Sequence, residues 1–553
     1  MAGPCSGAGV DHAHDRGVAR ADRRSPVDWS PVTPTDAGSA PRPSGSRPRD
    51  PRPVPLSELA DLVGRPVPGT PDVLVTGLTL ASGEVCPGDL YAALPGARTH
   101  GVRYVGEAVE RGAVAVLTDP TGAAEAAATG LPVCVVDDPR AVLGEVADRV
   151  YDRPSERLRV IGVTGTNGKT TTSYLIEAGL AAAGQASGLI GTVQTRTRAT
   201  DGTVTAIPSE RTTPEAPAVH ALLAAMAEAG ATTVVMEVSS HALVLGRVGA
   251  VRFAAAGFTN LGRDHLDFHG DLEEYFRAKA LLFDGRAAAE VVDVDDEHGR
   301  RLLDRPGRPR PTTVSIAGGD ADWRATDITA APDGGSRFTL HGPGAVRREA
   351  RVRLPGRFNV ANAVLAVALL DAVGVPLDAA LEGVATTVVP GRMEPVEAGQ
   401  PFVAVVDYAH TPDAVATALG ALRATSPGRL ITVLGCGGDR DPGKRAAMGE
   451  AAAAGGDVLV VTDDNPRSED PATIRAAMLA GVLDVPADRR AEVLEVGDRR
   501  AAIEAAVALA RPGDTVLVAG KGHETGQDIA GTVHPFDDRA VLREVLTTTR
   551  KPA

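Results

Sequence analysis

The stretch RLRVIGVTGTNGKTTTSYLIEAGL, Arg157 to Leu180, places a short glycine-containing loop between an apolar strand and a helix. Gly165 and Gly168 allow backbone N–H groups to face a phosphate, and the N-terminus of the following helix favours an anion. Lys169 would then reach the outer phosphates of a nucleotide, and the hydroxyl of Thr170 would hold magnesium. The stretch therefore predicts a phosphate-binding loop at the carboxyl end of a strand.

The glycine spacing departs from the usual phosphate-binding loop. That motif requires a glycine five residues before Gly168, but Val163 occupies the position, with Gly162 and Gly165 on either side of it. The alternative interpretation is a glycine-rich turn that binds nothing. The order Gly-Lys-Thr between a strand and a helix favours the phosphate site.

Charge limits the classes of partner that suit this chain. The 553 residues include 57 Lys and Arg and 71 Asp and Glu, which gives a formal net charge of -14. An acidic chain is poorly suited to nonspecific binding of nucleic acid or of an anionic membrane, because both favour basic surfaces. We therefore expect small-molecule substrates and no nucleic acid.

The sequence lacks the marks of export and of membrane insertion. It contains no run of about 18 apolar residues, and its N-terminus has no apolar core of the kind that a signal peptide needs. The cysteines lack the paired spacing of a zinc cluster or a disulfide framework; they are Cys5, Cys86, Cys134 and Cys436. We expect reduced thiols, no membrane span and a cytoplasmic location.

Composition divides the chain into an N-terminal extension and three blocks. Residues 1–52 are rich in Pro, Arg, Asp, Ser and Gly, and we expect them to be disordered because they cannot bury enough apolar surface. Strands and helices then alternate, which predicts mainly parallel sheets. We expect an α/β fold with domains at 53–157, 158–389 and 390–553, and a linker at 151–157. The central domain would be a P-loop ATPase domain of mainly parallel sheet, and the C-terminal domain Rossmann-like.

Three residues after the loop are candidates for a metal site. Glu237 ends the apolar run VVMEV, where a buried carboxylate is costly without a partner, and magnesium would supply one. Taken singly, His265 could be a hydrogen-bonded core histidine. Lys279, on an expected helix, could be a surface lysine whose stem covers apolar surface. Their joint occurrence after the loop favours a metal–nucleotide site.

Four motifs follow one another along the central block. They are GTNGKTT (165–171), EVSSH (237–241), NLGRDHLD (260–267) and YFRAKALLF (275–283). In this order they resemble the Mur ligase family, whose members are ATP-dependent, amide-forming enzymes of peptidoglycan synthesis. The resemblance extends over about residues 75 to 530. It implies that the first domain binds a UDP-linked substrate, the central domain ATP, and the C-terminal domain an amino acid.

The resemblance also implies the metal chemistry. Lys279 would be carbamylated by CO2 to N6-carboxylysine and, with Thr170, Glu237 and His265, would ligate two magnesium ions. Only a neutral amine reacts with CO2, so burial must lower an ordinary lysine pKa of about 10.4. The implied catalytic residues are Lys169, Glu237, His265 and Lys279. The implied ATP-binding residues are Gly165, Thr166, Asn167, Gly168, Lys169, Thr170, Thr171, Asn362, Arg392 and Asp407.

The stretch VVTDDNPRSED, residues 460–470, admits two interpretations. Asp, Asn and Pro favour a turn. Alternatively, an acid would bind an ammonium group while Arg467 binds a carboxylate through two parallel hydrogen bonds. In the Mur ligase family an Asp-Asn-Pro-Arg segment marks enzymes that select meso-diaminopimelate, which carries one more carboxylate than lysine. The implied diaminopimelate-binding residues are Arg440, Asp464, Asn465, Pro466, Arg467, Gly520 and Glu524.

The acceptor implied by the resemblance is UDP-MurNAc-L-Ala-D-Glu. The residues implied to bind it are Ser82, Thr212, Thr213, Ser239 and Arg247. The sequence departs from many relatives at Ala81 and Gly83 on either side of Ser82, at Arg211 and at Leu245. These changes concern the uracil and sugar contacts, and they leave the implied reaction class unchanged.

The implied reaction joins the amine of diaminopimelate to the D-glutamate γ-carboxylate through an acyl phosphate, and we expect a monomer. The alternatives are another ligase of the same superfamily, such as a D-alanyl-D-alanine-adding or folylpolyglutamate-type enzyme, a non-catalytic nucleotide-gated regulator, or a P-loop kinase or NTPase. The segment Asp464 to Arg467 opposes the related ligases. The joint presence of Lys169, Glu237, His265 and Lys279 opposes the regulator.

Overall fold

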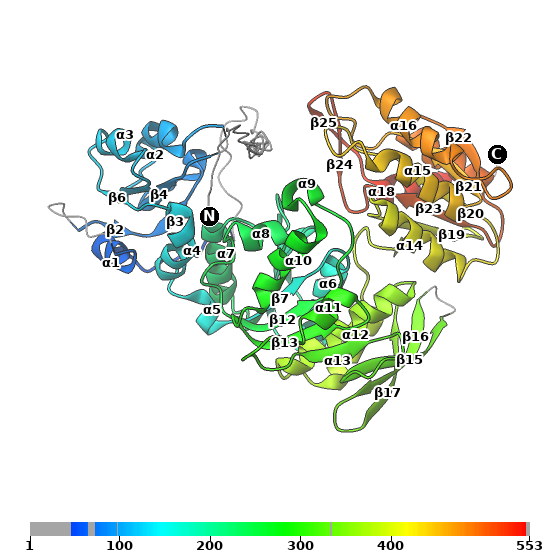
Figure 1. The fold of residues 1–553 in the computed structure, drawn as a ribbon, viewed down its shortest axis with the longest axis horizontal. Coiled ribbons are helices and arrows are strands. Elements are labelled where there is room, and N and C mark those ends of the chain that lie inside the picture. Colours follow the sequence, from blue (N-terminus) through cyan, green and yellow to red (C-terminus); the bar gives the residue numbers. More distant parts are fainter. Residues whose placement is uncertain (1–45, 65–71, 97, 332–334, 549–553) are drawn as a thin grey trace, which may run out of the picture.

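The computed structural model describes residues 46–64, 72–96, 98–331 and 335–548. Three main sheets follow one another along the chain, one in each of three lobes (Figure 1). Two further two-stranded sheets pair β1 (Val54–Pro55) with β2 (Leu74–Val75), and β24 (Gly526–Ile529) with β25 (Thr532–Pro535). The predicted α/β fold class, with a central, mainly parallel sheet and a Rossmann-like C-terminal domain, is confirmed. Among the described residues, no helix is both long enough and apolar enough to cross a membrane.

The predicted disordered extension lies largely outside the described residues, but its last residues contact the folded part. The guanidinium of Arg47 donates to both carboxylate oxygens of Asp89, at 2.7 and 2.9 Å. The backbone N–H groups of Arg49 and Asp50 donate to the carboxylate of Glu228. The boundary expected at residue 52 therefore differs in the structure, because residues 46–52 already bridge the first and central domains.

The first domain is built on a four-stranded parallel sheet in the order β3-β4-β5-β6. Its elements are β1 (Val54–Pro55), α1 (Leu56–Leu62), β2 (Leu74–Val75), β3 (Gly77–Thr79), η1 (Ser82–Glu84), β4 (Asp89–Ala93), η2 (Gly101–Tyr104), α2 (Val105–Glu110), β5 (Ala115–Thr118), α3 (Ala123–Ala127), β6 (Val133–Val135) and α4 (Pro139–Val150). One face of the sheet shares its apolar core with Ala216, Ala221 and Ala224 of the central domain. This shared core fixes the first domain against the central one.

The linker expected at 151–157 is shorter than predicted. Residues Pro154–Arg157 form helix α5, and both Pro154 and Ser155 are buried. Proline at the first position of a helix loses no hydrogen bond there, because that N–H has no partner within the helix. The chain therefore passes from the first domain to the central sheet through packed structure.

The central domain contains an eleven-stranded sheet in the order β10-β9-β8-β11-β7-β12-β13-β14-β15-β16-β17. The strands from β8 to β15 in this order are parallel, and both edges are antiparallel. The strands are β7 (Arg159–Thr164), β8 (Ser187–Ile190), β9 (Gln194–Arg198), β10 (Val204–Pro208), β11 (Thr233–Glu237), β12 (Phe253–Phe258), β13 (Ala287–Asp293), β14 (Thr312–Ser315), β15 (Trp323–Ala330), β16 (Ser336–Gly342) and β17 (Val346–Val352).

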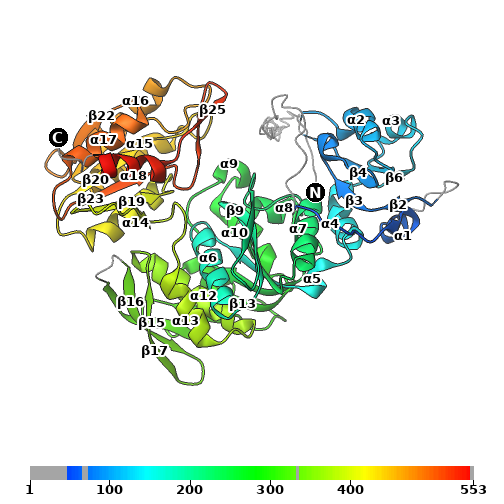
Figure 2. The same ribbon diagram turned by 180° about the vertical axis from the view of Figure 1, so that it is seen from behind.

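Helices cover both faces of this sheet (Figures 1 and 2). They are α6 (Lys169–Ala182), α7 (Ala216–Glu228), α8 (Ser240–Val244), α9 (Leu266–His269), α10 (Leu272–Ala280), η3 (Leu281–Phe283), α11 (Glu297–Arg301), α12 (Arg357–Ala372) and α13 (Leu377–Thr386). Successive side chains of a strand point to opposite faces. Accordingly, Val235 joins the core under α6 and α12, while Val234 and Met236 join the core under α7 and α10.

The C-terminal domain holds a six-stranded sheet in the order β18-β19-β23-β20-β21-β22, parallel except at β18. Its elements are β18 (Glu394–Pro395), β19 (Val403–Asp407), α14 (Pro412–Arg423), β20 (Leu430–Leu434), α15 (Lys444–Gly455), β21 (Val458–Val461), α16 (Pro471–Leu483), β22 (Glu492–Glu495), α17 (Arg499–Leu509), β23 (Thr515–Ala519), β24 (Gly526–Ile529), β25 (Thr532–Pro535) and α18 (Asp538–Thr548). Helices α14, α15 and α16 pack on one face, and α17 and α18 on the other. Ligands of such sheets bind at the carboxyl ends of the strands.

Candidate active site

The phosphate loop, residues 165–168, connects β7 to α6 as the sequence predicts. Gly165 has φ +146° and Gly168 has φ +90°, a region that side chains other than glycine rarely adopt. Any Cβ at Gly165 would collide with Thr259, and any Cβ at Gly168 would collide with Asn362. Both glycines are therefore required by backbone conformation and by space.

Residues at the end of β12 hold the phosphate loop from one side. Asn167 N–H donates to Oδ1 of Asn260 at 3.0 Å, and Thr259 Oγ1 donates to the Asn167 carbonyl at 2.6 Å. Thr166 N–H donates to the Asn260 carbonyl at 2.9 Å. These bonds fix the loop before any phosphate arrives, which lowers the ordering cost of binding.

Two lysines converge on one carbonyl oxygen of the loop. Nζ of Lys169 donates to the Gly165 carbonyl at 2.9 Å, and Nζ of Lys279 donates to the same oxygen at 2.8 Å. Lys279 is only 1% exposed. Burial, with the neighbouring charge of Lys169, holds the pKa of Lys279 well below its ordinary value. Because a neutral amine is the form that reacts with CO2, this burial favours carbamylation of Lys279.

Glu237 is fully buried at the end of β11, and its carboxylate is bound by neutral donors. Thr170 Oγ1 and Thr192 Oγ1 both donate to Oε2 at 2.9 Å, and Thr192 N–H donates to Oε1 at 2.9 Å. A buried carboxylate with no cation among these partners is suited to a metal ion. Thr192 follows the carboxyl end of β8 and was absent from the predicted site.

The structure places His265 at the rim of the same region. Its side chain is 49% exposed, and its Nε2 lies 3.4 Å from Oδ2 of Asp264. The residue has φ +53° and immediately precedes α9. The alternative interpretation of His265 as a core histidine is therefore wrong, because the side chain is half exposed. The alternative interpretation of Lys279 as a surface lysine is also wrong, because Lys279 is buried.

A cavity of about 770 Å³ lies over the phosphate loop and is bordered by two domains. The predicted residues that line it are Thr166, Asn167, Gly168, Lys169, Thr170, Thr171, Thr212, Glu237, His265, Asn362, Arg392 and Asp407. Asn362 is held by Asn359, whose Oδ1 accepts from Asn362 Nδ2 at 3.2 Å. The central and C-terminal domains thus contribute to one nucleotide-sized space.

Arg392 extends from the C-terminal domain toward the phosphate loop. Its guanidinium lies over the ring of Tyr408, 4.3 Å from the ring centre, and its Nη2 donates to Thr170 Oγ1 at 3.5 Å. Among the described residues, Nη1 of Arg392 is buried without a hydrogen-bond partner. Such a donor beside a phosphate loop is suited to an anionic oxygen. Asp407 accepts from the N–H groups of Met393 and Ala409, and burial raises its pKa.

The donor set fits magnesium only in part. Thr170 and Glu237 offer the hard oxygen ligands that magnesium prefers. Within the described residues, no group of three or more His, Cys, Asp and Glu side chains is arranged to hold a metal ion. Lys279 offers an amine, which would become an oxygen ligand only as a carbamate. The residues therefore fit magnesium together with nucleotide phosphates and a modified lysine.

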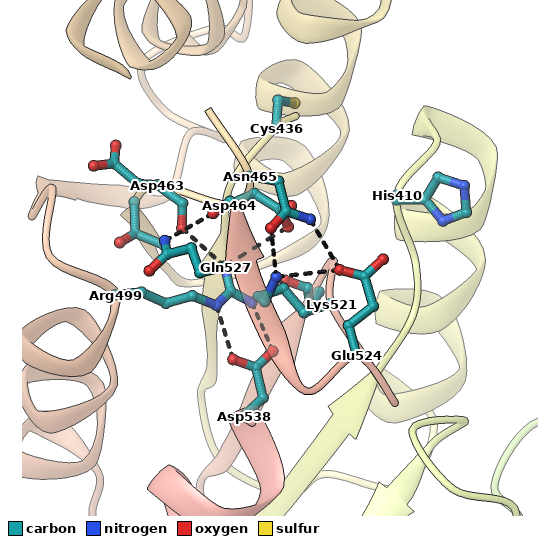
Figure 3. Close-up of polar contacts among 12 residues, drawn as sticks. His410, Cys436, Asp463, Asp464, Asn465, Arg499, Lys521, Glu524, Gln527 and Asp538 are labelled. Carbon is teal, nitrogen blue, oxygen red and sulfur yellow. Dashed lines mark hydrogen bonds and ion pairs between the residues drawn. The ribbon is translucent and has the colours of Figure 1, made fainter. Parts of the chain in front are cut away.

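The amino-acid loop, residues 464–467, follows β21 at the carboxyl end of the C-terminal sheet (Figure 3). Asp464 and Asn465 are buried. Gly520, after β23, has φ +111°, and a Cβ there would lie 2.7 Å from Oδ2 of Asp464. The Gly520 N–H donates to the Asp407 carbonyl at 3.1 Å, which joins this loop to the nucleotide cavity.

A hairpin of β24 and β25 supports the same loop. Arg467 has φ +51°, and its backbone exchanges hydrogen bonds with Asp528 and Ala530 at 3.0 and 2.7 Å. Gln527 Nε2 donates to the Asp464 carbonyl at 2.7 Å. Nη1 of Arg467 donates to the Gly438 carbonyl at 2.5 Å, across the loop that carries the exposed Arg440. The structure thus brings the predicted amino-acid-binding residues to one end of one sheet.

Lys521, which was absent from the predicted site, links Glu524 to the amino-acid loop. Nζ of the buried Lys521 donates to Oδ1 of Asn465 at 2.9 Å and to Oε2 of Glu524 at 3.1 Å. Nδ2 of Asn465 donates to the same Glu524 oxygen at 2.9 Å. Lys521 stands at a strand end in the sequence, which is the signal that could have found it.

The predicted acceptor residues of the central domain form a connected group. Thr213 Oγ1 donates to the Glu237 carbonyl at 2.9 Å and accepts from the Ser239 N–H at 3.0 Å. Thr212 Oγ1 lies 3.0 Å from Oγ1 of Thr192, which donates a hydrogen bond to Glu237. Arg247 donates to the Thr213 carbonyl at 3.2 Å. These contacts place the predicted acceptor group next to the metal candidates.

Two residues implied to bind the UDP-linked acceptor lie differently from that expectation. Arg247, one of the implied acceptor-binding residues, already pairs within the protein with Glu215 at 2.9 Å. Glu215 also pairs with Arg211 at 2.8 Å. Arg211 is exposed. Ser82 lies in η1 of the first domain and does not line the nucleotide cavity.

Three family models match the chain. They are the Mur ligase family catalytic domain at residues 74–151, the Mur ligase middle domain at 163–370, and the Mur ligase glutamate ligase domain at 391–522. The three matches follow the order of the three domains along the chain.

Relatives similar to this chain carry two names. A Streptomyces avermitilis protein named UDP-N-acetylmuramoyl-L-alanyl-D-glutamate–2,6-diaminopimelate ligase is 55% identical over 510 residues, which cover 92% of this chain and 99% of the relative. A Leifsonia xyli protein named UDP-N-acetylmuramyl-tripeptide synthetase is 46% identical over 517 residues, covering 92% and 99%. A solved structure of a UDP-N-acetylmuramoyl-L-alanyl-D-glutamate–2,6-diaminopimelate ligase has a TM-score of 0.63 and 32% identity, covering 91% of this chain and 100% of that chain.

Proposed function

Because this chain belongs to the Mur ligase family of ATP-dependent, amide-forming ligases, we propose that it joins meso-2,6-diaminopimelate to UDP-MurNAc-L-Ala-D-Glu. The product would be the UDP-MurNAc-tripeptide of peptidoglycan synthesis. The observation that carries this proposal is the arrangement of Asp464 to Arg467 beside Glu524, at the carboxyl end of the C-terminal sheet. Asp407, at the end of β19 in the same sheet, also borders the nucleotide cavity.

The nucleotide end of the reaction belongs to the central domain. The γ-carboxylate of D-glutamate attacks the γ-phosphate of ATP, which gives an acyl phosphate and releases ADP. In this proposal Lys169 and the phosphate loop stabilise the charge on the transferring phosphoryl group. Arg392 adds a donor from the C-terminal domain, and closure of the two domains over the nucleotide would exclude water from the acyl phosphate.

Two magnesium ions and a carbamate on Lys279 complete this site in our proposal. Thr170, Glu237, His265 and the modified Lys279 would hold the metal, which supplies positive charge to the phosphates when it is bound. Support comes from the buried Glu237 with its neutral partners and from the pKa of Lys279, which burial holds far below that of a free lysine.

The amino-acid end of the reaction belongs to the C-terminal domain. The diaminopimelate amine attacks the acyl carbon, and phosphate leaves from the tetrahedral intermediate. Arg467 and Arg440 would bind the distal carboxylate, while Asp464 and Glu524 would bind the distal ammonium group. Lysine lacks that carboxylate and would leave a guanidinium without its partner, which makes the selection strong. Ser82, Thr212, Thr213, Ser239 and Arg247 would bind the UDP-linked acceptor.

The test is product analysis. The protein is incubated with ATP, magnesium and UDP-MurNAc-L-Ala-D-Glu, with meso-diaminopimelate and L-lysine in parallel reactions, and the products are weighed by mass spectrometry. We expect the diaminopimelate-containing tripeptide together with ADP. Phosphate release without any amide product would contradict the proposal. The monomeric state and the cytoplasmic location stay predictions.

A further inference from the structure

We propose that Lys521 is a positioning residue that sets the preference for a diamino acid carrying a distal carboxylate over one that lacks it. The inference rests on the proposed function, since it concerns the same amino-acid site. Lys521 directly follows Gly520 at the end of β23, and its side chain is fully buried. A buried ammonium group is costly unless acceptors surround it. Its acceptors are Asn465 and Glu524, two residues placed in the amino-acid site.

Lys521 fixes the orientation of the Asn465 amide. Oδ1 of Asn465 accepts from Lys521 Nζ at 2.9 Å and from the Asp528 N–H at 3.0 Å. With both donors on the oxygen, the amide nitrogen must face the other way, where it donates to Oε2 of Glu524 at 2.9 Å. Figure 3 shows the three side chains in one closed group.

The same contacts orient Glu524. Nζ of Lys521 and Nδ2 of Asn465 both bind Oε2. The side chain of Glu524 is 33% exposed. Because both hydrogen bonds end on Oε2, neither of them occupies Oε1, which can accept a bond from an incoming ammonium group. Lys521 thus determines which edge of the carboxylate faces the substrate.

Lys521 also sets the charge of the site. Arg499 pairs with Asp538 at 2.7 Å, and Lys521 pairs with Glu524 at 3.1 Å. Asp464, 4.0 Å from Arg499, then carries the surplus negative charge. One surplus negative charge balances the distal ammonium group of the substrate, while Arg467 and Arg440 would bind its distal carboxylate. Without Lys521 the site would hold a second surplus negative charge, which favours the more cationic L-lysine over diaminopimelate.

The test compares Lys521→Met with Arg429→Met. Arg429 pairs with Asp514 at 2.8 Å at the opposite, amino end of the same sheet, so the control also removes a cation from an ion pair of this domain. For Lys521→Met we expect the ratio of kcat/KM for diaminopimelate to that for L-lysine to fall about tenfold or more, with the KM for ATP within about twofold of wild type. Arg429→Met should leave that ratio unchanged. L-lysine is followed as a competitive inhibitor if its turnover is too slow.

Two further variants keep the test decisive. Lys521→Gln retains a donor without the charge and should show the same loss of preference, even if Lys521→Met fails to fold. Lys521→Arg retains the charge and should recover most of the preference. An unchanged ratio in folded Lys521→Met or Lys521→Gln would overturn the inference while leaving the proposed function intact. A wild-type protein that ligates neither amino acid would overturn the proposed function itself.

Discussion

The phosphate loop and the amino-acid loop both lie at carboxyl ends of parallel strands, but they are assembled differently. The phosphate loop is held through its backbone by Thr259 and Asn260, which lie more than ninety residues further along the chain. In the amino-acid loop a side chain, that of Asn465, also takes part in the contacts. The amino-acid loop takes its support from Lys521, Glu524 and the β24–β25 hairpin, which lie more than fifty residues further along the chain.

Support by side chains marks the region where amino-acid specificity can change without loss of the reaction. Because phosphate binding by a loop at a helix N-terminus depends mainly on backbone groups, we expect the phosphate loop to serve the step common to ligases of this kind. A loop whose side chains take part in the contacts depends on individual residues, such as Lys521 and Arg467, that can be exchanged one at a time. Substitutions in the first region should therefore abolish turnover, and substitutions in the second should alter the choice of amino acid.

The largest effect is expected from Lys169→Ala. Removal of the ammonium group that we propose to bind the phosphates should lower kcat by about 10²–10³-fold with either amino acid, because the shared phosphoryl step would lose charge stabilisation. Steady-state ADP release measures it. Near-normal turnover would remove the nucleotide role of the phosphate loop and break the comparison.

A smaller and more selective loss is expected from Arg467→Lys. The substitution keeps the charge but removes the planar, two-pronged donor, so kcat/KM for meso-diaminopimelate should fall by about 10²-fold while the KM for ATP is unchanged. Competition between the two amino acids in one reaction provides the readout. Equal losses with diaminopimelate and L-lysine would contradict the assigned role of Arg467.

Removal of CO2 should affect only the nucleotide region. Because burial lowers the pKa of Lys279, the neutral amine persists at a pH where an ordinary lysine is charged, and protonation at lower pH should drive off the carbamate. We expect activity in carbonate-free buffer to fall about tenfold, more steeply toward pH 6, and bicarbonate to restore it. Bicarbonate should have no effect on Lys279→Ala. Full activity without CO2 would exclude the carbamate.

Gly520→Ala probes the amino-acid region by backbone geometry. The residue has φ +111°, and an added Cβ would lie 2.7 Å from Oδ2 of Asp464. We expect a loss of about 1–3 kcal/mol in the free energy of unfolding and a raised KM for diaminopimelate. Denaturant titration and kinetics of the same preparation give both values. A raised KM for ATP with an unchanged KM for diaminopimelate would contradict this expectation, because the substitution would then disturb the nucleotide cavity and not the amino-acid site.

The smallest effect concerns Asp293, which lines the nucleotide cavity. Burial, with the charges of Asp295 and Asp296, raises its pKa from 3.8 to about 7. The folded protein therefore binds more protons than the unfolded chain between these values, and its stability should fall as pH rises through them. Asp293→Asn should remove about 2 kcal/mol of that fall between pH 5 and pH 8. Identical pH profiles of wild type and variant in denaturant titrations would contradict the shift.

The sequence predicted contiguous features better than assembled ones. Gly165 to Thr171 and the buried strand ending at Glu237 are local patterns of glycine placement and apolar residues, and the structure shows them as expected. The convergence of Lys169 and Lys279 on the Gly165 carbonyl joins helices far apart along the chain, so no local pattern reports it.

Other failures have the same cause. Thr192 was missed because a threonine after a strand is unremarkable until Glu237 is found beside it. Arg47 was assigned to a disordered extension because its composition is polar, whereas its partner Asp89 lies in another segment of the chain. Long-range ion pairs and tertiary contacts override local composition at such positions.

The most direct test of the central claim is a crystal structure of this protein with meso-diaminopimelate and a non-hydrolysable ATP analogue. We expect the guanidinium of Arg467 to lie within hydrogen-bonding distance of the distal carboxylate, with Glu524 facing the distal ammonium group and the nucleotide over the phosphate loop. An Arg467 side chain that points into bulk solvent, with the amino acid bound elsewhere, would contradict it.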